Sequence, residues 1–262
     1  MAEGMESKKV LFEKNKRVGI ITLNNGEFNV FDPEQIYQFR DLMKQLQWDQ
    51  KVRAILIQGS GDRAFSSGFD LKHLDKEIII EVGQEMIYRL YNLPKPTIAL
   101  VHGYAIGIGF LVALACDFRY ATEAAQFSLP EINYDVMFPT HGGCSILPKL
   151  VNTPSAAKYI LYTGDRIPAR KIAQFGIIDE IFQTKDEMFA AGLKFAQYLC
   201  TKNPIVMSCT KAALNTTRFA DIKTGFAIEM EAVQFIDRPP SMKRKEQLEA
   251  AKKFIEKYSE KF

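Results

Sequence analysis

The chain has 262 residues, of which 47% are hydrophobic and 25% charged, and this composition argues against intrinsic disorder. Basic and acidic side chains number 34 and 31, so the net charge is only +3, which argues against a nucleic-acid partner. No apolar run is long enough to span a membrane, and we expect a cytoplasmic protein without membrane association.

The first third of the chain predicts alternating strands and helices. Two β-prone runs, at residues 10–13 and Val18–Leu23, predict a hairpin. Apolar residues recur at helical spacing over residues 33–48, and Asp32 is suited to cap this helix. A short apolar run at 54–58 predicts a buried strand. The order strand, helix, strand favours a right-handed parallel unit.

The alternation continues and then gives way to helices. A helix over 79–93, a strand at Thr97–Val101, a short apolar helix over 110–115 and a strand at Phe118–Thr122 are predicted in that order. From residue 155 onward helical patterns dominate, and the last four predicted helices cover 185–203, 205–217, 221–236 and 243–258. We therefore predict an α/β core over residues 1–200 and a helical C-terminal region over 201–262.

The cysteines predict neither a disulfide framework nor a metal site. None of the four lies in CxxC spacing, and their surroundings are apolar or mixed. We expect buried or partly buried free thiols and hence a reducing compartment. These cysteines are Cys116, Cys144, Cys200 and Cys209.

Two glycine-containing loops each follow a predicted buried strand. The first, residues 63–72, reads Arg-Ala-Phe-Ser-Ser-Gly-Phe-Asp-Leu-Lys, and the second spans residues 102–117. Glycine lets bare backbone approach a ligand, and the start of a following helix offers unpaired N–H groups. Taken singly, each loop is better explained by tight packing of a helix against a strand.

Together the two loops resemble those of the enoyl-CoA hydratase/isomerase (crotonase) family, and the motifs are closest to the Δ3,Δ2-enoyl-CoA isomerases. The similarity continues through residues 125–132, 161–166 and 176–180, and it covers roughly residues 10–215. This resemblance implies a crotonase-like ββα spiral core, followed by a helical C-terminal trimerisation region. A homotrimer or a hexamer is therefore expected.

The resemblance also implies the site. Its two oxyanion donors are the backbone N–H groups of Phe69 and Ile108, which bind the carbonyl oxygen of an acyl-CoA thioester. No metal and no separate cofactor are implied, because coenzyme A is part of the substrate. Basic candidates for the CoA phosphates are Arg63 and Lys72, with Lys14 or Arg17 as further ones. The implied substrate-binding residues are Ala64, Ser66, Gly68, Asp70, Leu71, Gly107, Gly109, Leu111, Pro130 and His141.

The number of carboxylates favours one reaction within the family. Hydratases of this family use two glutamates, but the first position here is Leu111 and only the second, Glu131, is acidic. One carboxylate suffices to move a proton from C2 to C4 of a 3-enoyl thioester, which is isomerisation in fatty acid metabolism. For this task Glu131 should lie in an apolar pocket that raises its pKa above about 4.3.

Several alternatives stay open. Asp135 could replace the missing carboxylate, which would make the protein a hydratase and thus a lyase, and His141 could serve as base in a hydrolase or decarboxylase. A catalytically silent CoA-binding homologue and an RNA-binding protein of the same fold are further alternatives. Asp70 is interpreted as a turn residue of the first loop, and His73 and His102 as packing or capping residues.

Overall fold

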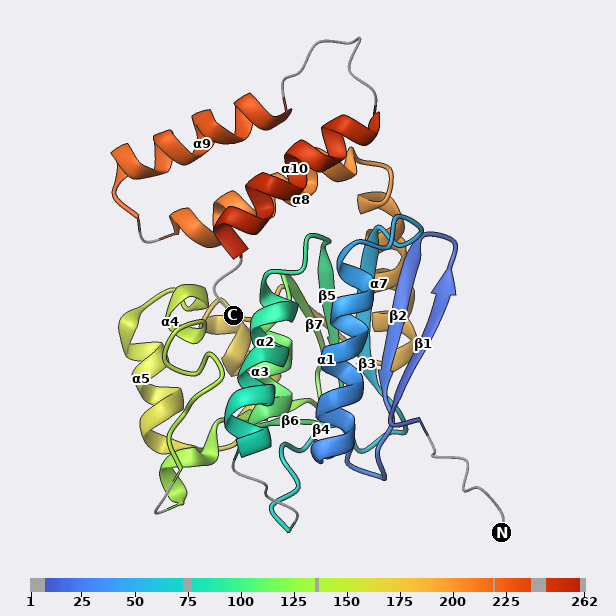
Figure 1. Ribbon diagram of the computed structural model, residues 1–262. Coiled ribbons are helices and arrows are strands. Elements are labelled where there is room, and N and C mark those ends of the chain that lie inside the picture. Colours follow the sequence, from blue (N-terminus) through green and yellow to red (C-terminus); the bar gives the residue numbers. More distant parts are fainter. Residues whose placement is uncertain (1–7, 73–76, 135–136, 219, 237–243, 260–262) are drawn as a thin grey trace.

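The computed structural model describes residues 8–72, 77–134, 137–218, 220–236 and 244–259, and its largest sheet has six strands (Figure 1). Their order across the sheet is β1-β2-β3-β5-β7-β10. The hairpin β1–β2 is antiparallel and all the other pairs are parallel. The strands are β1 (Val10–Asn15), β2 (Val18–Leu23), β3 (Ala54–Gly59), β5 (Thr97–Val101), β7 (Phe118–Thr122) and β10 (Glu180–Phe182).

A smaller sheet of four short strands lies beside the first, in the order β4-β6-β8-β9. The strands are β4 (Ala64–Ser66), β6 (Tyr104–Ile106), β8 (Gln126–Ser128) and β9 (Ile167–Pro168). In the parallel pair β4–β6, Ser66 stands opposite Ala105. Because β4, β6 and β8 directly follow β3, β5 and β7, each coil of the chain gives one strand to each sheet. This arrangement confirms the predicted α/β spiral.

Helices cover both faces of the large sheet. In Figure 1, α1, α2 and α3 lie on one face and α7 on the other. The helices are α1 (Pro33–Gln47), α2 (Gly83–Tyr91), α3 (Ile108–Ala115), α4 (Leu147–Leu150), α5 (Pro154–Thr163), α6 (Ala169–Gln174), α7 (Lys185–Leu199), α8 (Pro204–Thr217), α9 (Ile222–Ile236) and α10 (Arg244–Ser259). The π-helix η1 (Ile78–Val82) precedes α2, and the 3-10 helix η2 (Pro130–Asn133) follows β8.

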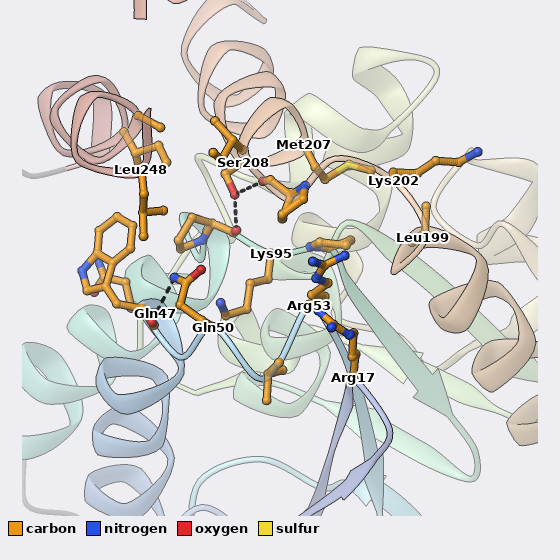
Figure 2. A pocket seen from close by; sticks show the side chains of 18 of the residues that line it. Arg17, Gln47, Gln50, Arg53, Lys95, Leu199, Lys202, Met207, Ser208 and Leu248 are labelled. Atoms are coloured by element: carbon orange, nitrogen blue, oxygen red, sulfur yellow. Dashed lines mark hydrogen bonds between the residues drawn. The ribbon is translucent and has the colours of Figure 1, made fainter. Parts of the chain in front are cut away.

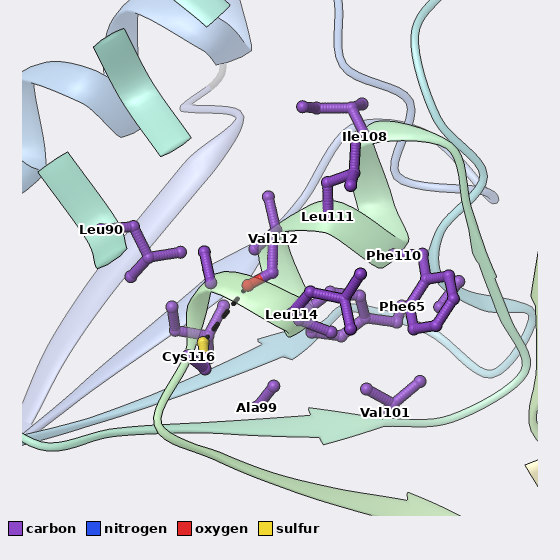
Figure 3. Packing of buried hydrophobic residues seen from close by; sticks show 14 of the residues in the cluster. Phe65, Leu90, Ala99, Val101, Ile108, Phe110, Leu111, Val112, Leu114 and Cys116 are labelled. Carbon is purple, nitrogen blue, oxygen red and sulfur yellow. Dashed lines mark hydrogen bonds between the residues drawn. The ribbon is translucent and has the colours of Figure 1, made fainter. Parts of the chain in front are cut away.

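Helix α3 is buried over its whole length, since all eight of its residues are buried. It carries apolar side chains on every side, which is the pattern of a helix enclosed by its neighbours. Figure 3 shows Leu111, Val112 and Leu114 of this helix among side chains from β4, β5 and α2. The start of α3, which carries Ile108, is consequently fixed by packing.

Four local predictions need correction. The helix predicted over 79–93 begins as the π-helix and ends at Tyr91, and the helix predicted from residue 110 begins at Ile108. Strand pairing in the hairpin continues to Asn15, so that only two residues turn; Lys16 has a φ of +56° there. All four cysteines are free, but Cys144 is exposed and not buried as expected, because its loop lies on the surface.

Helices α8, α9 and α10 pack around a small core of their own, with Cys209, Ile228 and Phe254 at its centre. They lie beyond one end of the large sheet, away from β4 and β6 (Figure 1). The predicted division at residue 200 falls between α7 and α8 and stays a prediction, as does trimerisation. In the part of the chain that the structure describes, no helix combines the length and apolarity needed to cross a membrane.

Candidate active site

The first glycine loop continues from β4 and is held by a neighbouring segment. Phe31 N donates to Gly68 O at 2.8 Å, and Asp70 N donates to Phe31 O at 2.9 Å. This parallel bridge uses the groups on either side of Phe69 and leaves the N–H of Phe69 itself without an acceptor among the described residues. Gly68 has a φ of +106°, a region that L side chains avoid, so glycine is needed for this loop shape.

The second glycine loop links β6 to α3. Gly107 N donates to Ser128 O at 2.9 Å, which ties the loop to β8. Gly107 occupies the N-cap position of α3 with a φ of +53°, and Ile108 is the first helical residue. The N–H of a first helical residue has no partner within its helix. No acceptor from the described chain is bonded to the N–H of Ile108 either.

The structure brings the two loops and Glu131 together. A methyl group built on Gly107 would lie 3.5 Å from Glu131 Oε1 and 4.0 Å from Gly68 Cα. A methyl group on Gly109 would lie only 2.4 Å from Ser66 O, so α3 begins in direct contact with β4. Gly68 and Gly107, which directly precede the two predicted donors, therefore lie close to each other and to the predicted carboxylate.

Glu131 lies in η2, directly after β8, with its carboxyl group largely removed from water. Its Oε2 is buried and has no hydrogen-bond partner in the part of the chain that the structure describes. Burial raises the pKa of the Glu131 carboxyl above its ordinary value. An unpartnered carboxylate of this kind is suited to accept a proton and later to return it.

The burial of Glu131 predicts an effect on stability. Because folding raises the pKa of Glu131, the folded protein is relatively more stable when this carboxyl is protonated. This contribution is fully present below pH 4.5 and is lost as the pH rises through the pKa of the folded state. We therefore expect Glu131→Gln to raise Tm at about pH 8 more than at about pH 4. Thermal unfolding at both values measures this, with Glu13→Gln on the exposed side of β1 as control. An equal increase in Tm for both variants would contradict a buried charge at Glu131.

Other predicted site residues surround this volume. Leu111 is 2% exposed within α3, and Ser66 and Ala64 are fully buried in β4. Ser66 Oγ accepts from Gly68 N at 3.3 Å, which supports the loop. Leu71, near the end of the first loop, is 47% exposed. Pro130 is the first residue of η2.

Asp70 is a turn residue in the structure, as interpreted from the sequence. Its Oδ1 accepts from Lys72 N at 3.0 Å, which closes the turn that ends the first loop.

Among the basic candidates for the CoA phosphates, Arg63 pairs with Glu27 at 2.8 Å. Arg17 lies in the β1–β2 turn, at the opposite end of the large sheet from the glycine loops. Asp135 and His73 lie outside the described residues.

His141 is buried and both of its ring nitrogens are engaged. Nε2 lies 2.8 Å from Ile79 O, a carbonyl that can only accept, so Nε2 carries the proton and Nδ1 accepts from the Thr140 hydroxyl. Burial lowers the pKa of His141, which keeps the ring neutral. The ring also packs edge-on against Phe69 at 5.4 Å between centroids. His141 thus connects η1 to the first glycine loop.

Two supporting contacts were not anticipated from the sequence. Phe31 bridges to the first loop across 38 positions, and no local pattern marks such a contact. Ser128 Oγ donates to Gly164 O at 2.8 Å and so anchors the segment before Glu131 to the end of α5. Gly164 lies in the segment 161–166, and the similarity of this segment to the family was the only feature of the sequence that pointed to the contact.

Comparison with known proteins gives consistent results. A sequence profile of the enoyl-CoA hydratase/isomerase family matches residues 13–262. The crotonyl-CoA hydratase of Syntrophomonas wolfei is 29% identical over 235 residues, which cover 87% of this chain and 89% of that protein. The short-chain-enoyl-CoA hydratase of Clostridium acetobutylicum is 28% identical over 235 residues, with the same coverage.

A solved structure extends the similarity to three dimensions. The crystal structure of an enoyl-CoA hydratase from Bacillus anthracis superposes with a TM-score of 0.83 at 26% identity, over 94% of this chain and 96% of that one. The profile match spans nearly the whole chain, including both glycine loops and Glu131. The chain belongs to the enoyl-CoA hydratase/isomerase family.

Proposed function

We propose that the protein is an enoyl-CoA isomerase, which converts a 3-enoyl-CoA thioester into the 2-enoyl isomer by proton transfer. The observation that carries this proposal is the buried, unpartnered oxygen of Glu131 beside the two glycine loops. Leu111, at the position where the family's hydratases have the first of their two glutamates, is apolar and 2% exposed. One proton-transferring group beside two backbone donors suits isomerisation better than hydration.

In the proposed reaction, the thioester oxygen accepts hydrogen bonds from the N–H groups of Phe69 and Ile108. Glu131 takes a proton from C2, and the C–H electron pair moves into a dienolate whose negative charge rests on that oxygen. The proton returns from Glu131 to C4, and the double bond comes into conjugation with the carbonyl. One such donor stabilises the charged intermediate by roughly 3 to 4 kcal/mol, and the N-terminus of α3 adds a favourable field.

A hydratase is the second candidate. The relatives reported above are named hydratases, and 2-enoyl thioesters would then be the substrates. Hydration would require a second group to hold the water, for which Asp135 is the candidate. His141 is a weaker candidate for such a role, because both of its nitrogens are already engaged.

A comparison of substrates tests the proposal. Purified protein is incubated with a 3-enoyl-CoA and, separately, with the 2-enoyl-CoA of equal chain length, and products are separated by chromatography. We expect fast conversion of the 3-enoyl substrate and slow or no formation of the 3-hydroxy product. Fast hydration without isomerisation would reject the isomerase in favour of the hydratase. No reaction with either substrate would favour a silent CoA-binding homologue.

We further propose that the chain self-associates through its C-terminal helices in the cytoplasm. Helix α9 carries exposed apolar side chains at helical spacing, and Leu214 adds another from α8. Contiguous exposed apolar surface of this kind usually marks an interface. Sedimentation should show the wild type as an oligomer, either a trimer or a hexamer. The Phe226→Asp variant should sediment as a smaller species. The exposed residues of α9 are Ile222, Phe226, Met230 and Val233.

A further inference from the structure

A cavity of about 390 Å³ lies between the large sheet and helices α8 and α10 (Figure 2). Its floor is formed by Arg17, Arg53 and Lys95, which precede β2, β3 and β5 respectively. It therefore opens at the amino ends of the parallel strands. The glycine loops follow the carboxyl ends of β3 and β5, so this cavity is separate from the proposed active site.

The cavity is strongly cationic. Five of its described lining residues are basic, and none of the described ones is acidic. Asp49 borders the floor: its backbone oxygen accepts from Lys95 Nζ, and its carboxylate lies 3.8 Å from Lys14 Nζ. The basic lining residues are Arg17, Arg53, Lys95, Lys202 and Lys245.

Lys95 is the most informative of these residues, because it is only 7% exposed. Its Nζ donates to Asp49 O at 3.0 Å, and no carboxylate of the described chain forms an ion pair with it. Burial lowers the pKa of Lys95 to about 8. The charge of the nearby Asp49 carboxylate offsets this burial only in part, and a buried ammonium that forms no ion pair is costly to the fold. An anion in the cavity would remove that cost.

The remaining walls of the cavity are mostly apolar, with Gln47, Gln50 and Ser208 as the polar exceptions. Core and helices contribute Trp48, Leu199, Ile205, Met207, Leu248 and Ile255. Small-molecule sites typically have volumes of roughly 300–1,000 Å³ and combine apolar walls with a few placed polar groups. This cavity lies at the small end of that range. Its lining fits a molecule with one anionic end and an apolar body.

We propose that this cavity binds a small amphiphilic anion, with a carboxylate or phosphate group held between Arg17, Arg53 and Lys95 and an apolar body against α8 and α10. Guanidinium and ammonium groups are the usual partners of both anion types. The bound molecule would contact the core on one side and Lys202 and Lys245 on the other. It would therefore stabilise the docking of the C-terminal helices onto the core.

Calorimetric titration of the full-length protein tests the proposal, with octanoate, octyl phosphate, inorganic phosphate and octanol as probes. We expect one of the two amphiphilic anions to bind and raise Tm, and octanol and inorganic phosphate to bind at least about tenfold more weakly. A preference for octanoate or octyl phosphate identifies the anionic group. Equal binding of octanol would overturn the proposal.

Variants locate the bound anion. Lys95→Met keeps the side-chain length and should weaken binding about tenfold or more, and Arg17→Gln, at an exposed position, should weaken it several-fold. Lys158→Met, on the exposed face of α5, is the matched control and should bind like the wild type. Glu131→Gln should also bind like the wild type. Loss of binding in Glu131→Gln alone would place the anion in the active site and overturn the proposal.

Proton linkage provides a readout that a purely structural lysine would not give. A bound anion favours the charged form of Lys95, so binding near its pKa of about 8 should take up protons. Titrations in buffers of different ionisation enthalpy measure this uptake, which should vanish in Lys95→Met. Uptake that persists in that variant would contradict the assignment. The charged residues around Lys95 are Arg17, Asp49, Arg53, Asp117, Lys202, Lys211 and Lys245.

Discussion

Replacing Glu131 by glutamine should lower kcat for isomerisation by about 10²- to 10⁴-fold, because the amide has nearly the same shape but cannot accept the C2 proton. Both backbone donors remain in place in this variant, so substrate binding should change little. Initial rates with a 3-enoyl-CoA over a range of concentrations separate kcat from KM. We expect KM within about threefold of the wild type, since only an interaction specific to the transition state is removed.

Two features allow the effect of Glu131→Gln on activity to be interpreted. The variant should be at least as stable as the wild type at neutral pH, because a buried charge is removed, so a loss of activity cannot be attributed to unfolding. Glu13→Gln, which changes an exposed glutamate of β1, should keep full activity. A loss below about tenfold in Glu131→Gln would exclude this residue as the base.

Replacing Gly109 by alanine should lower kcat/KM by about 10²-fold or more, through geometry and not through chemistry. The added methyl group would lie 2.4 Å from Ser66 O and 2.7 Å from Ser66 Cβ. Ser66 is fully buried in β4, so the start of α3 must move away from the first loop. The N–H of Ile108 would then no longer converge with that of Phe69. Overpacking should also destabilise the fold by about 1 to 3 kcal/mol.

Kinetics and thermal unfolding of Gly109→Ala measure the two effects, and Gly225→Ala is the matched control. A methyl group on Gly225, in α9, meets nothing within 4 Å. This control should keep its activity and gain up to about 1 kcal/mol from the higher helix propensity of alanine. If Gly109→Ala retained wild-type kcat/KM, the contact between α3 and β4 would not determine the position of the donors.

The large sheet and its helices could be predicted because their hydrophobic periodicity extends over many residues. Asp32 illustrates this, since its cap on α1 follows from local rules and its Oδ1 accepts from Gln35 N at 2.9 Å. The small sheet could not be predicted in this way. Its strands are three residues or shorter, and they are defined by pairing across coils of the spiral.

The candidate site was predicted through its similarity to a family and not through periodicity. The glycine loops and Glu131 were identified from motifs, and the structure places them in one volume. The engaged state of His141 was not predicted, because it depends on a contact across 62 positions between His141 and Ile79 of η1. The cationic cavity was not predicted either, because its basic residues come from separate parts of the chain.

The pairing of β4 with β6 sets the spacing of the two proposed donors. Ser66 stands opposite Ala105, and Phe69 and Ile108 each follow three residues later. Both donors are therefore reached after the same number of residues from one paired rung, so the pairing limits how far apart the two turns that carry them can lie. The number of residues in each loop therefore constrains the position of its donor, as the glycines of the loop do. Inserting one residue into either loop would displace one amide relative to the other and leave the oxygen with a single donor.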